Sequence, residues 1–458
     1  TLITSSAASD VYKRQPTGHL HIGGARTALF SWLFAKSKGG QFLLRFEDTD
    51  TERSKDEFKD SILKSLEWLN LNPDEEPIHQ SRNLERHKSL ALSLFEKGAA
   101  YYCDCSIEEL EELRATQIKN KQKPMYDGRS REKNLEYEGK NVLRYKMPDA
   151  STSFEDLILG AITVDNRELD DFIILRADGT PTYNFCAAVD DLDMKISTVI
   201  RGDDHLTNTI KQLNIIKSLE GNLPNYAHLP MVLSESGKRL SKRDGALDIM
   251  DYKSEGYLSG ALLNYIVRLG WAKDEVEKFT MNELIDFFDL SDVNSSPSKF
   301  SLQLLDWYNN EYLKEMDSST LLKLLSEIGS IIDENFKNIH GIIDVLKVGA
   351  KSLKEIEENF DMFLKSPSID KSDSLASEEN IKIIKDFLDN FDFSKDENLE
   401  SISQRLKDYI NNNDLKFPQL GKPLRYALTG RTNAPGIGEL LYLLGNEESR
   451  KRIKNYLE

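Results

Sequence analysis

The sequence lacks three features that would each indicate a particular class of protein. It holds only three cysteines among 458 residues, which excludes a disulfide framework and predicts a reducing, cytoplasmic location. No apolar run approaches the roughly 18 residues that a membrane helix needs. An excess of positive charge is missing too, since 77 Asp and Glu outnumber 60 Lys and Arg and give a net charge of -17. This balance argues against non-specific coating of nucleic acid, but it leaves room for local basic patches.

A Walker A loop, internal repeats and sustained heptads are also absent, so the sequence supports neither a P-loop enzyme nor a repeat or coiled-coil protein. What is present is 39% hydrophobic and 30% charged residues, the mixture of a globular protein. At about 100–200 residues per domain, the length predicts two to four domains.

Apolar periodicity predicts an α/β protein. A helical pattern follows the turn at Pro16, and a short apolar strand covers residues 41–46. Ser54 and Glu57 form a capping box for the next helix. Strands that alternate with helices in this rhythm indicate a Rossmann-like, doubly wound parallel sheet.

Three stretches break this rhythm. Residues 1–15 are rich in Ser and Ala and show neither a secretory signal nor a clear strand pattern, so we interpret them as a non-native remnant in place of a native first strand. A divergent native strand is the alternative. Residues 106–182 mix a charged helix with short strands, which predicts an inserted α+β subdomain. From about residue 251 the pattern is almost entirely helical, with a capping box at Thr280 and Glu283.

Two motifs carry chemistry. The first, PTGHLHIGG, places His21, Gly23 and Gly24 at the start of a helix, where backbone N–H groups favour phosphate and an imidazole can donate to a phosphate oxygen. Taken alone, a His beside a turn is equally well a surface residue. The second, GKRLSKR, carries Arg239 and Lys242 in a glycine-flanked loop that suits the clamping of a triphosphate. An ordinary solvated basic loop is its other interpretation.

These motifs, in this order, resemble the class I aminoacyl-tRNA synthetases. Further segments resemble the bacterial glutamyl-tRNA synthetases within that family: LLRFEDTDTERS, PTYNFCAAVDDLDMKISTVIRGDDH and, near the end, PLRYALTGRTNAPGIGELLYLLG. The resemblance runs from Pro16 to the last residues of the chain. It implies an enzyme that activates L-glutamate with ATP and Mg²⁺, transfers it to the 3' end of tRNA-Glu, and acts as a monomer.

The resemblance also implies roles for individual residues. The catalytic residues would be His21, Arg239 and Lys242. ATP would contact His21, Gly23, Gly24, Asp204 and Lys242. Glutamate would contact Glu47 through its amino group, and Tyr183 and Arg201 elsewhere. Two positions depart from the usual motifs, because Gly24 stands where many class I enzymes have His and Arg239 where a first Lys is usual.

The same resemblance divides the chain into functional segments. After the leader at 1–15, the two halves of the catalytic domain would cover 16–105 and 183–250, and the insertion at 106–182 would bind the acceptor end. A helical region at 251–315 would contact the tRNA stem, and a helical domain at 316–458 would bind the anticodon.

Two further departures predict consequences. Just before Pro16, the family has an arginine and then Ala-Pro-Ser. This chain has Val11 at the position of the arginine and Gln15 at the position of the serine. We therefore expect weak glutamate activation until a family-type strand is restored. Cys103 and Cys105 resemble half of a zinc site found in some members, but the segment that would complete it holds no Cys or His. Since two thiolates do not make a four-ligand site, we expect no zinc.

Three alternatives stay open at this point. The chain could also charge tRNA-Gln. It could be a glutamyl-queuosine tRNA synthetase paralogue, although that paralogue ends soon after the catalytic core. It could also be a non-catalytic RNA-binding relative of the synthetases.

Overall fold

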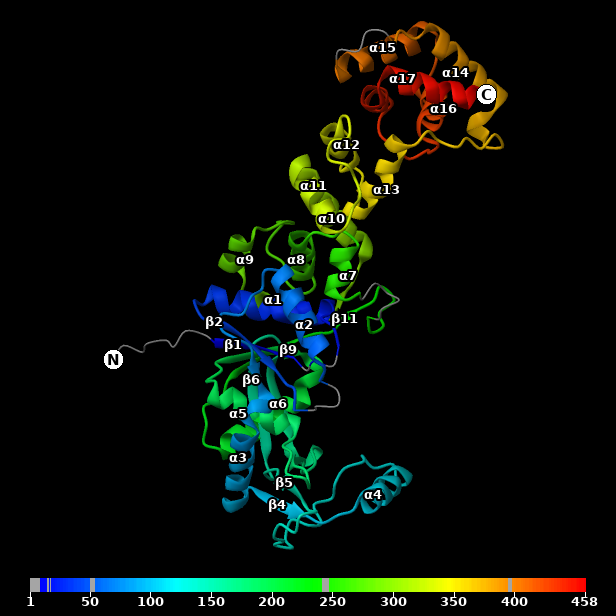
Figure 1. Cartoon of the computed structure of the whole chain (residues 1–458). Helices are drawn as coiled ribbons and strands as arrows, with labels where there is room; N and C mark the ends of the chain where they lie inside the picture. The colour runs from blue at the N-terminus through cyan, green and yellow to red at the C-terminus, as the bar shows by residue number, and fades with distance from the viewer. Residues whose placement is uncertain (1–8, 15, 17, 50–53, 241–246, 394–397) are drawn as a thin grey trace. The chain divides into compact units, whose positions relative to one another are not determined.

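A computed structural model of the chain describes residues 9–14, 16, 18–49, 54–240, 247–393 and 398–458 (Figure 1). The chain forms two compact units. The first comprises Thr1–Asp251 and Leu263–Leu302, and the second comprises Tyr252–Leu262 and Gln303–Glu458. The segment 251–315, expected as one helical region, is therefore divided between the units.

A seven-stranded sheet organises the first unit. All its neighbouring strands are parallel except the antiparallel β6–β7 hairpin. In spatial order the strands are β3 (Ile78–His79), β2 (Gln41–Phe46), β1 (Ser9–Arg14), β9 (Thr198–Gly202), β10 (Asn225–Leu229), β6 (Ser151–Asp156) and β7 (Gly160–Asp165). The strand order reverses between β1 and β9, which confirms the doubly wound prediction.

Helices connect these strands, as a parallel sheet requires. They are α1 (Ile22–Ser37), α2 (Asp56–Trp68), α3 (Leu84–Glu96), α5 (Tyr183–Asp193) and α6 (Leu206–Ser218). The capping box expected from Ser54 is wrong, because α2 starts one residue later with Lys55 as its N-cap and without a side-chain cap. The capping box of Thr280 and Glu283 is confirmed at the start of α9 (Met281–Phe287).

The interpretation of residues 1–15 as a segment without a strand is wrong for residues 9–14. These residues form β1, which pairs with β2 over six residues and lies in the middle of the sheet. Asp10, Val11 and Tyr12 are all buried, so both faces of the strand are covered. A strand buried on both faces shows no alternation of polar and apolar residues, and charged residues within it conceal the apolar run that would have indicated it.

A second, antiparallel sheet carries the insertion. It consists of β4 (Ala100–Cys103), β5 (Val142–Tyr145) and β8 (Ile173–Leu175). The expected boundary at residue 106 therefore does not match the sheets, since β4 already belongs to the second sheet while β6 and β7 extend the first. The charged helix α4 (Ile107–Lys119) has a capping box but no buried residue, and its Leu110 packs against a small cluster that includes Tyr101 and Cys103 of β4.

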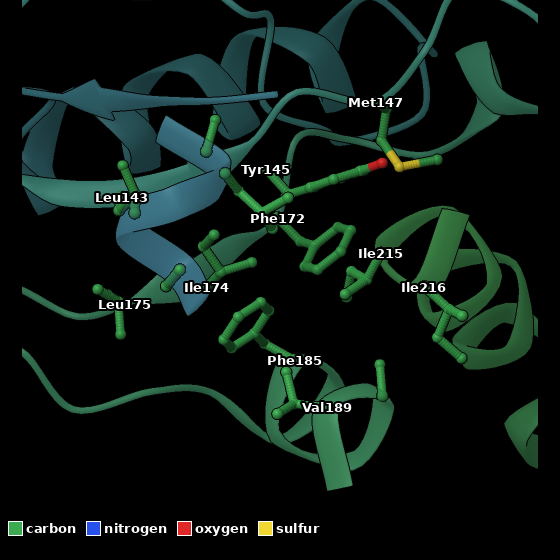
Figure 2. Close-up of a cluster of buried hydrophobic side chains, with 14 of the residues drawn as sticks. Leu143, Tyr145, Met147, Phe172, Ile174, Leu175, Phe185, Val189, Ile215 and Ile216 are labelled. Carbon is green, nitrogen blue, oxygen red and sulfur yellow. The ribbon is translucent and has the colours of Figure 1, made fainter. Parts of the chain in front are cut away.

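An apolar cluster joins the second sheet to the helices of the seven-stranded sheet (Figure 2). Phe185 and Val189 of α5 and Ile215 of α6 are fully buried against Leu143 and Tyr145 of β5. Burial of each such side chain contributes about 1.5–3 kcal/mol. The cluster fixes α5 and α6, and with them the site residues at their N-terminal ends.

Further helices complete the two units. The first unit also contains the short strands β11 (Val232–Leu233) and β12 (Ser298–Lys299). Helices α7 (Ile249–Ser254) and α8 (Ser259–Arg268) each contribute residues to both units. The regular structure described beyond α9 and β12 is helical: α10 (Leu302–Glu315), α11 (Ser318–Glu327), α12 (Ile339–Leu346), α13 (Leu353–Leu364), α14 (Glu378–Asn390), α15 (Leu399–Asn412), α16 (Phe417–Thr429) and α17 (Ile437–Leu457). Among the described residues, no helix is long and apolar enough to cross a membrane.

Candidate active site

The residues singled out in the sequence gather where the strands of the large sheet end. His21 comes after β1 at the start of α1, Glu47 directly follows β2, and Arg201 lies near the end of β9, three residues before Asp204. The carboxyl ends of parallel strands share one edge of a sheet, and ligands bind there at the point where strand order reverses. The β1–β9 boundary is that point in this fold.

His21 is the N-cap of α1. Its Nδ1 accepts a hydrogen bond from the backbone N–H of Gly24 at 3.2 Å. In a neutral ring the proton is then on Nε2, which makes that atom the donor. Gly23 allows the ring to fold back, because a Cβ at this position would lie 3.2 Å from Cε1 of His21. The exposed imidazole and the helix N-terminus together suit a phosphate.

Arg26, one turn further along α1, was not recognised in the sequence. It is buried, and its Nη1 donates to the carbonyl of Leu269 at 2.9 Å while its Nη2 donates to the carbonyl of Pro230. Burial lowers the pKa of Arg26 to about 10, which is still far above neutrality. The side chain fixes the start of α1 to the segment that follows β10.

Glu47 is buried beside a second carboxylate and an arginine. Nη2 of Arg45 lies 3.1 Å from Oε1 of Glu47, and Nη1 of Arg45 lies 2.9 Å from Oδ1 of Asp191. Lys13 forms a further ion pair with Asp191. Burial alone would lower the pKa of Arg45, but these carboxylates raise it, so the guanidinium stays charged. The charges of the group are thus compensated within the protein.

Asp190 extends this group toward α3. Its oxygens accept from Nε2 of His87 at 2.7 Å and from Nε2 of Gln80 at 2.8 Å, and Nε of Arg45 lies 3.8 Å away. Burial alone would raise the pKa of Asp190, but the hydrogen bond from His87 and the charge of Arg45 hold it below its usual range. None of Arg45, Asp190 and His87 belongs to the set that the sequence indicated.

Tyr183 interacts electrostatically with Glu47 and Arg201. Tyr183 begins α5 and is half-buried, and burial and the Glu47 carboxylate raise its pKa while Arg201 opposes them. Its ring centroid is 6.5 Å from that of His205. Arg201 itself is only 7% exposed. A carboxylate after β2, a hydroxyl at the start of α5 and a guanidinium of β9 are thus linked electrostatically at one edge of the sheet.

The turn after β9 is tight and ends on an exposed carboxylate. A Cβ on Gly202 would lie 2.6 Å from Oδ1 of Asp204, so a larger residue would displace that side chain. Asp204 is exposed, whereas His205 is half-buried and burial lowers its pKa.

The basic loop is described only in part. Arg239 is exposed and forms an isolated bridge with Leu233, after a turn in which Gly237 has φ 78°. Lys242 lies outside the described residues. Where the description resumes, Asp248 forms a bridge with His21, so the end of the loop returns to the start of α1.

The N-terminal strand presents Lys13, and not Val11, to this site. Val11 is fully buried in an apolar cluster with Leu43 and Val199. Lys13 faces Asp191, and burial lowers its pKa to about 8. Gln15, the other position at which the sequence departs from the family, lies outside the described residues.

The donor set near Cys103 does not fit a zinc ion. Its Sγ lies 3.4 Å from the Tyr126 hydroxyl, and Sγ of Cys105 lies 3.7 Å from Oγ of Ser130. Ser130 donates in turn to Asp104 at 2.9 Å. A neutral serine stands where a third thiolate or imidazole would be needed. In the part of the chain that the structure describes, no group of three His, Cys, Asp or Glu could hold a metal ion.

Comparison with known proteins agrees with this geometry. Residues 12–307 match the family model described as tRNA synthetases class I (E and Q), catalytic domain, and residues 299–457 match an anticodon binding domain. The chain belongs to this class I tRNA synthetase family. The resemblance drawn from the sequence motifs is thereby confirmed.

Individual synthetases match along the whole chain. It is 41% identical over 459 residues to a glutamate–tRNA ligase of Herminiimonas arsenicoxydans, with 96% of this chain and 97% of the relative covered. It is 42% identical over 454 residues to a glutamate–tRNA ligase of Nitrosomonas europaea, with 97% of each covered.

Solved structures agree. A glutamate–tRNA synthetase of Elizabethkingia anophelis has a TM-score of 0.87 and 30% identity, with 99% of this chain and 100% of that chain covered. A glutamate tRNA ligase of Elizabethkingia meningosepticum, solved in complex with its amino acid, has a TM-score of 0.86 and 29% identity, with 99% of each chain covered.

Proposed function

We propose that this chain is a glutamate–tRNA ligase. The observation that carries the proposal is that a buried carboxylate, Glu47, and a buried guanidinium, Arg201, lie at the carboxyl ends of β2 and β9 and both act electrostatically on the Tyr183 hydroxyl. Glutamate offers an ammonium to the first and a carboxylate to the second. The full-length relatives named glutamate–tRNA ligase support the same conclusion.

The reaction has two steps. The α-carboxylate of glutamate attacks the α-phosphorus of ATP, and pyrophosphate leaves with the electrons of the broken P–O bond. The terminal ribose hydroxyl of tRNA-Glu then attacks the carbonyl of the glutamyl-adenylate, loses its proton and expels AMP. Neither step needs a covalent enzyme intermediate, so the protein contributes positioning and electrostatic stabilisation.

His21, Gly23, Gly24 and Asp204 are proposed to contact ATP. The Nε2–H of His21 would donate to phosphate, and the two glycines bring the N-terminus of α1 close to it. Asp204 is placed to meet the nucleoside, since it follows β9 on the same edge of the sheet. Its exposed carboxylate is also a hard oxygen donor of the kind that holds Mg²⁺, which usually arrives on the substrate's phosphates.

Arg239 and Lys242 are proposed to neutralise the phosphate charge that develops in the first step. The role of Lys242 is supported by the GKRLSKR motif alone. Asp248, which follows the basic loop, forms a bridge with His21, and this supports a role of the loop at the phosphate end of the site. When bound with the nucleotide, Mg²⁺ would supply additional neutralisation.

Arg201 is proposed to bind the side-chain carboxylate of glutamate. The α-carboxylate must face ATP to react, whereas the side-chain carboxylate stays charged throughout both steps. A buried, fixed cation suits the group that does not react. Glu47 would take the ammonium and Tyr183 would close the pocket between them.

We also propose how the tRNA is divided over the chain. The insertion at 106–182 would bind the acceptor end, the helices at 251–315 the stem, and those at 316–458 the anticodon. The match of residues 299–457 to an anticodon binding domain supports the last assignment and disfavours a paralogue without such a domain. A monomer is proposed, which light scattering of the purified chain would test.

Charging of purified tRNA tests the proposal. Wild-type protein should attach glutamate to tRNA-Glu with ATP, and glutamate-dependent pyrophosphate exchange should require tRNA. Absence of both activities, in a chain whose N-terminal strand has been restored to the family type, would favour a non-catalytic relative. Charging of tRNA-Gln in the same assay would identify a non-discriminating enzyme.

A further inference from the structure

Arg201 is held by three side chains from other elements. Its Nη1 donates to Oε1 of Gln212 at 2.9 Å, its Nη2 donates to the hydroxyl of Thr209, and its Nε donates to Nε2 of His228 at 3.3 Å. All four residues are buried. Each terminal nitrogen of a guanidinium carries a pair of N–H groups, so these contacts leave one on each for a ligand. The guanidinium is therefore oriented before any substrate is bound.

Only one tautomer of His228 allows this arrangement. Its Nδ1 lies 2.6 Å from Oδ2 of Asp156, and a carboxylate only accepts, so the proton is on Nδ1. Nε2 then presents a lone pair to Nε of Arg201 and to the hydroxyl of Thr209, which is 2.8 Å away. Burial lowers the pKa of His228 and Arg201 lowers it further, against the opposing effect of Asp156, so the ring is neutral.

Asp156 is kept ionised by backbone groups. Its Oδ1 accepts from the N–H groups of Ile158 at 3.0 Å, Leu159 at 2.9 Å and His228 at 3.2 Å. Burial alone would raise the pKa of Asp156, but the hydrogen bonds from His228 and the backbone lower it. The carboxylate comes from β6 and the imidazole from β10, so this chain of hydrogen bonds crosses the sheet to reach β9.

We propose that Asp156 and His228 are positioning residues that set the specificity of Arg201 for a carboxylate. Asp156 fixes the tautomer, the lone pair of His228 fixes the guanidinium, and the remaining N–H groups of Arg201 then meet a carboxylate in a bidentate geometry. The proposal rests on the proposed function only for the identity of the ligand, the side-chain carboxylate of glutamate.

Two exchanges at His228 separate its two hydrogen bonds. In His228→Asn the amide N–H can replace Nδ1–H toward Asp156, but no acceptor remains for Arg201. In His228→Gln the amide oxygen can take the place of Nε2 and accept from Arg201. We expect His228→Asn to raise KM for glutamate about tenfold or more and His228→Gln clearly less, because lost outer contacts to a binding group typically cost about 10–100-fold. KM for ATP and kcat at saturating glutamate should change less than about twofold.

Asp156→Asn tests the tautomer. The three backbone N–H groups require an oxygen at Oδ1, so the new amide nitrogen must face His228 and donate to Nδ1. The proton then moves to Nε2 and confronts the N–H of Arg201. The same selective rise in KM for glutamate is expected. Asp60→Asn, at an exposed aspartate of α2, is the matched control and should leave the kinetics and Tm unchanged.

Arg201→Lys distinguishes a failure of the positioning role proposed for Asp156 and His228 from a failure of the role proposed for Arg201. A rise in KM for glutamate in Arg201→Lys, without one in folded Asp156→Asn and His228→Asn, would overturn the inference alone. No rise in Arg201→Lys would overturn the assignment of Arg201. Should the wild type form no glutamyl-tRNA, ¹⁵N spectra of labelled histidine still decide the inference. They should show His228 with a protonated Nδ1 and a bare Nε2, and the reverse in Asp156→Asn, and any other tautomer in the wild type would overturn it.

Discussion

Two buried aspartates in the same sheet show opposite environments. Asp156 at the end of β6 accepts hydrogen bonds from three backbone N–H groups and an imidazole, and its pKa is held below the usual range. Asp10 in β1 is fully buried, and neither of its oxygens has a hydrogen-bond partner among the described residues. Burial raises the pKa of Asp10 well above its usual value, and the nearby Ser31 and Lys13 offset only part of that.

These two aspartates show which buried carboxyl groups the surrounding strands satisfy. The neighbouring strands β6 and β10 satisfy the buried charge of Asp156 with hydrogen bonds, as native proteins generally do. Within the described residues, the Asp10 carboxyl group of β1 lies in the interior without a hydrogen-bond partner, which costs free energy at neutral pH.

The largest expected effect comes from removing the cation of Arg45, which compensates three buried carboxylates. Arg45→Met would leave Glu47, Asp190 and Asp191 buried without their common cation. Removing one partner of a buried ion pair costs about 3–5 kcal/mol, so the free energy of unfolding should fall by that amount in urea titrations. Arg45→Lys keeps the charge and should lose clearly less. Equal stability of the wild type and Arg45→Met would contradict the view that these charges depend on Arg45.

The second-largest effect concerns strand β1 and the residue that follows it. Exchanging Val11→Arg, Lys13→Ala, Arg14→Pro and Gln15→Ser together restores the family pattern before Pro16. We expect tRNA-dependent pyrophosphate exchange with glutamate to rise about tenfold or more in kcat/KM, because substrate contacts made at the reacting centre are regained. Equal activity of the two versions would show that the present strand already serves the site.

The third effect tests Asp10 directly. Its raised folded pKa means that its stabilising contribution is complete below the unfolded pKa near 4 and is lost as pH rises through the folded value. Asp10→Asn should therefore raise the free energy of unfolding at pH 7 by about 1–3 kcal/mol and leave it nearly unchanged at pH 4. Tm measured at both pH values checks this. Destabilisation at pH 7 would mean that Asp10 is satisfied after all.

The smallest effect extends the comparison to the insertion. Ser130 lies between Cys105 and Asp104 where a third thiolate would be needed for a zinc site. Metal analysis should find no zinc in the wild type and about one zinc per chain in Ser130→Cys, since three thiolates with the Tyr126 hydroxyl supply a tetrahedral donor set. Ser130→Ala is the control and should bind none. One zinc per chain in the wild type would overturn the account of this cluster.

The sequence indicated the residues that stand next to strand ends. Glu47 directly follows β2, Arg201 is near the end of β9 and His21 begins α1, and the family motifs surround them, so their common edge could be predicted. The doubly wound sheet could also be predicted, because its helices and most of its strands show clear apolar periodicity.

The residues that support these side chains could not be found from local pattern. His228 and Asp156 are 72 positions apart, and Arg45 and Asp191 are 146 apart, so only the fold brings them together. A buried polar residue within a strand also leaves no periodic signal. Strand β1 was missed for a related reason, because Asp10 and Lys13 interrupt its apolar run.

We propose that Arg201, oriented by His228 and Asp156, selects a substrate carboxylate. The most direct test is calorimetric binding of a non-reactive glutamyl-adenylate analogue and of its glutaminyl counterpart, in which the carboxylate is an amide. The account predicts tighter binding of the glutamyl analogue by about tenfold or more, the cost of leaving a buried charge without its partner, and loss of this preference in His228→Asn. Equal binding of the two analogues by the wild-type chain would contradict it.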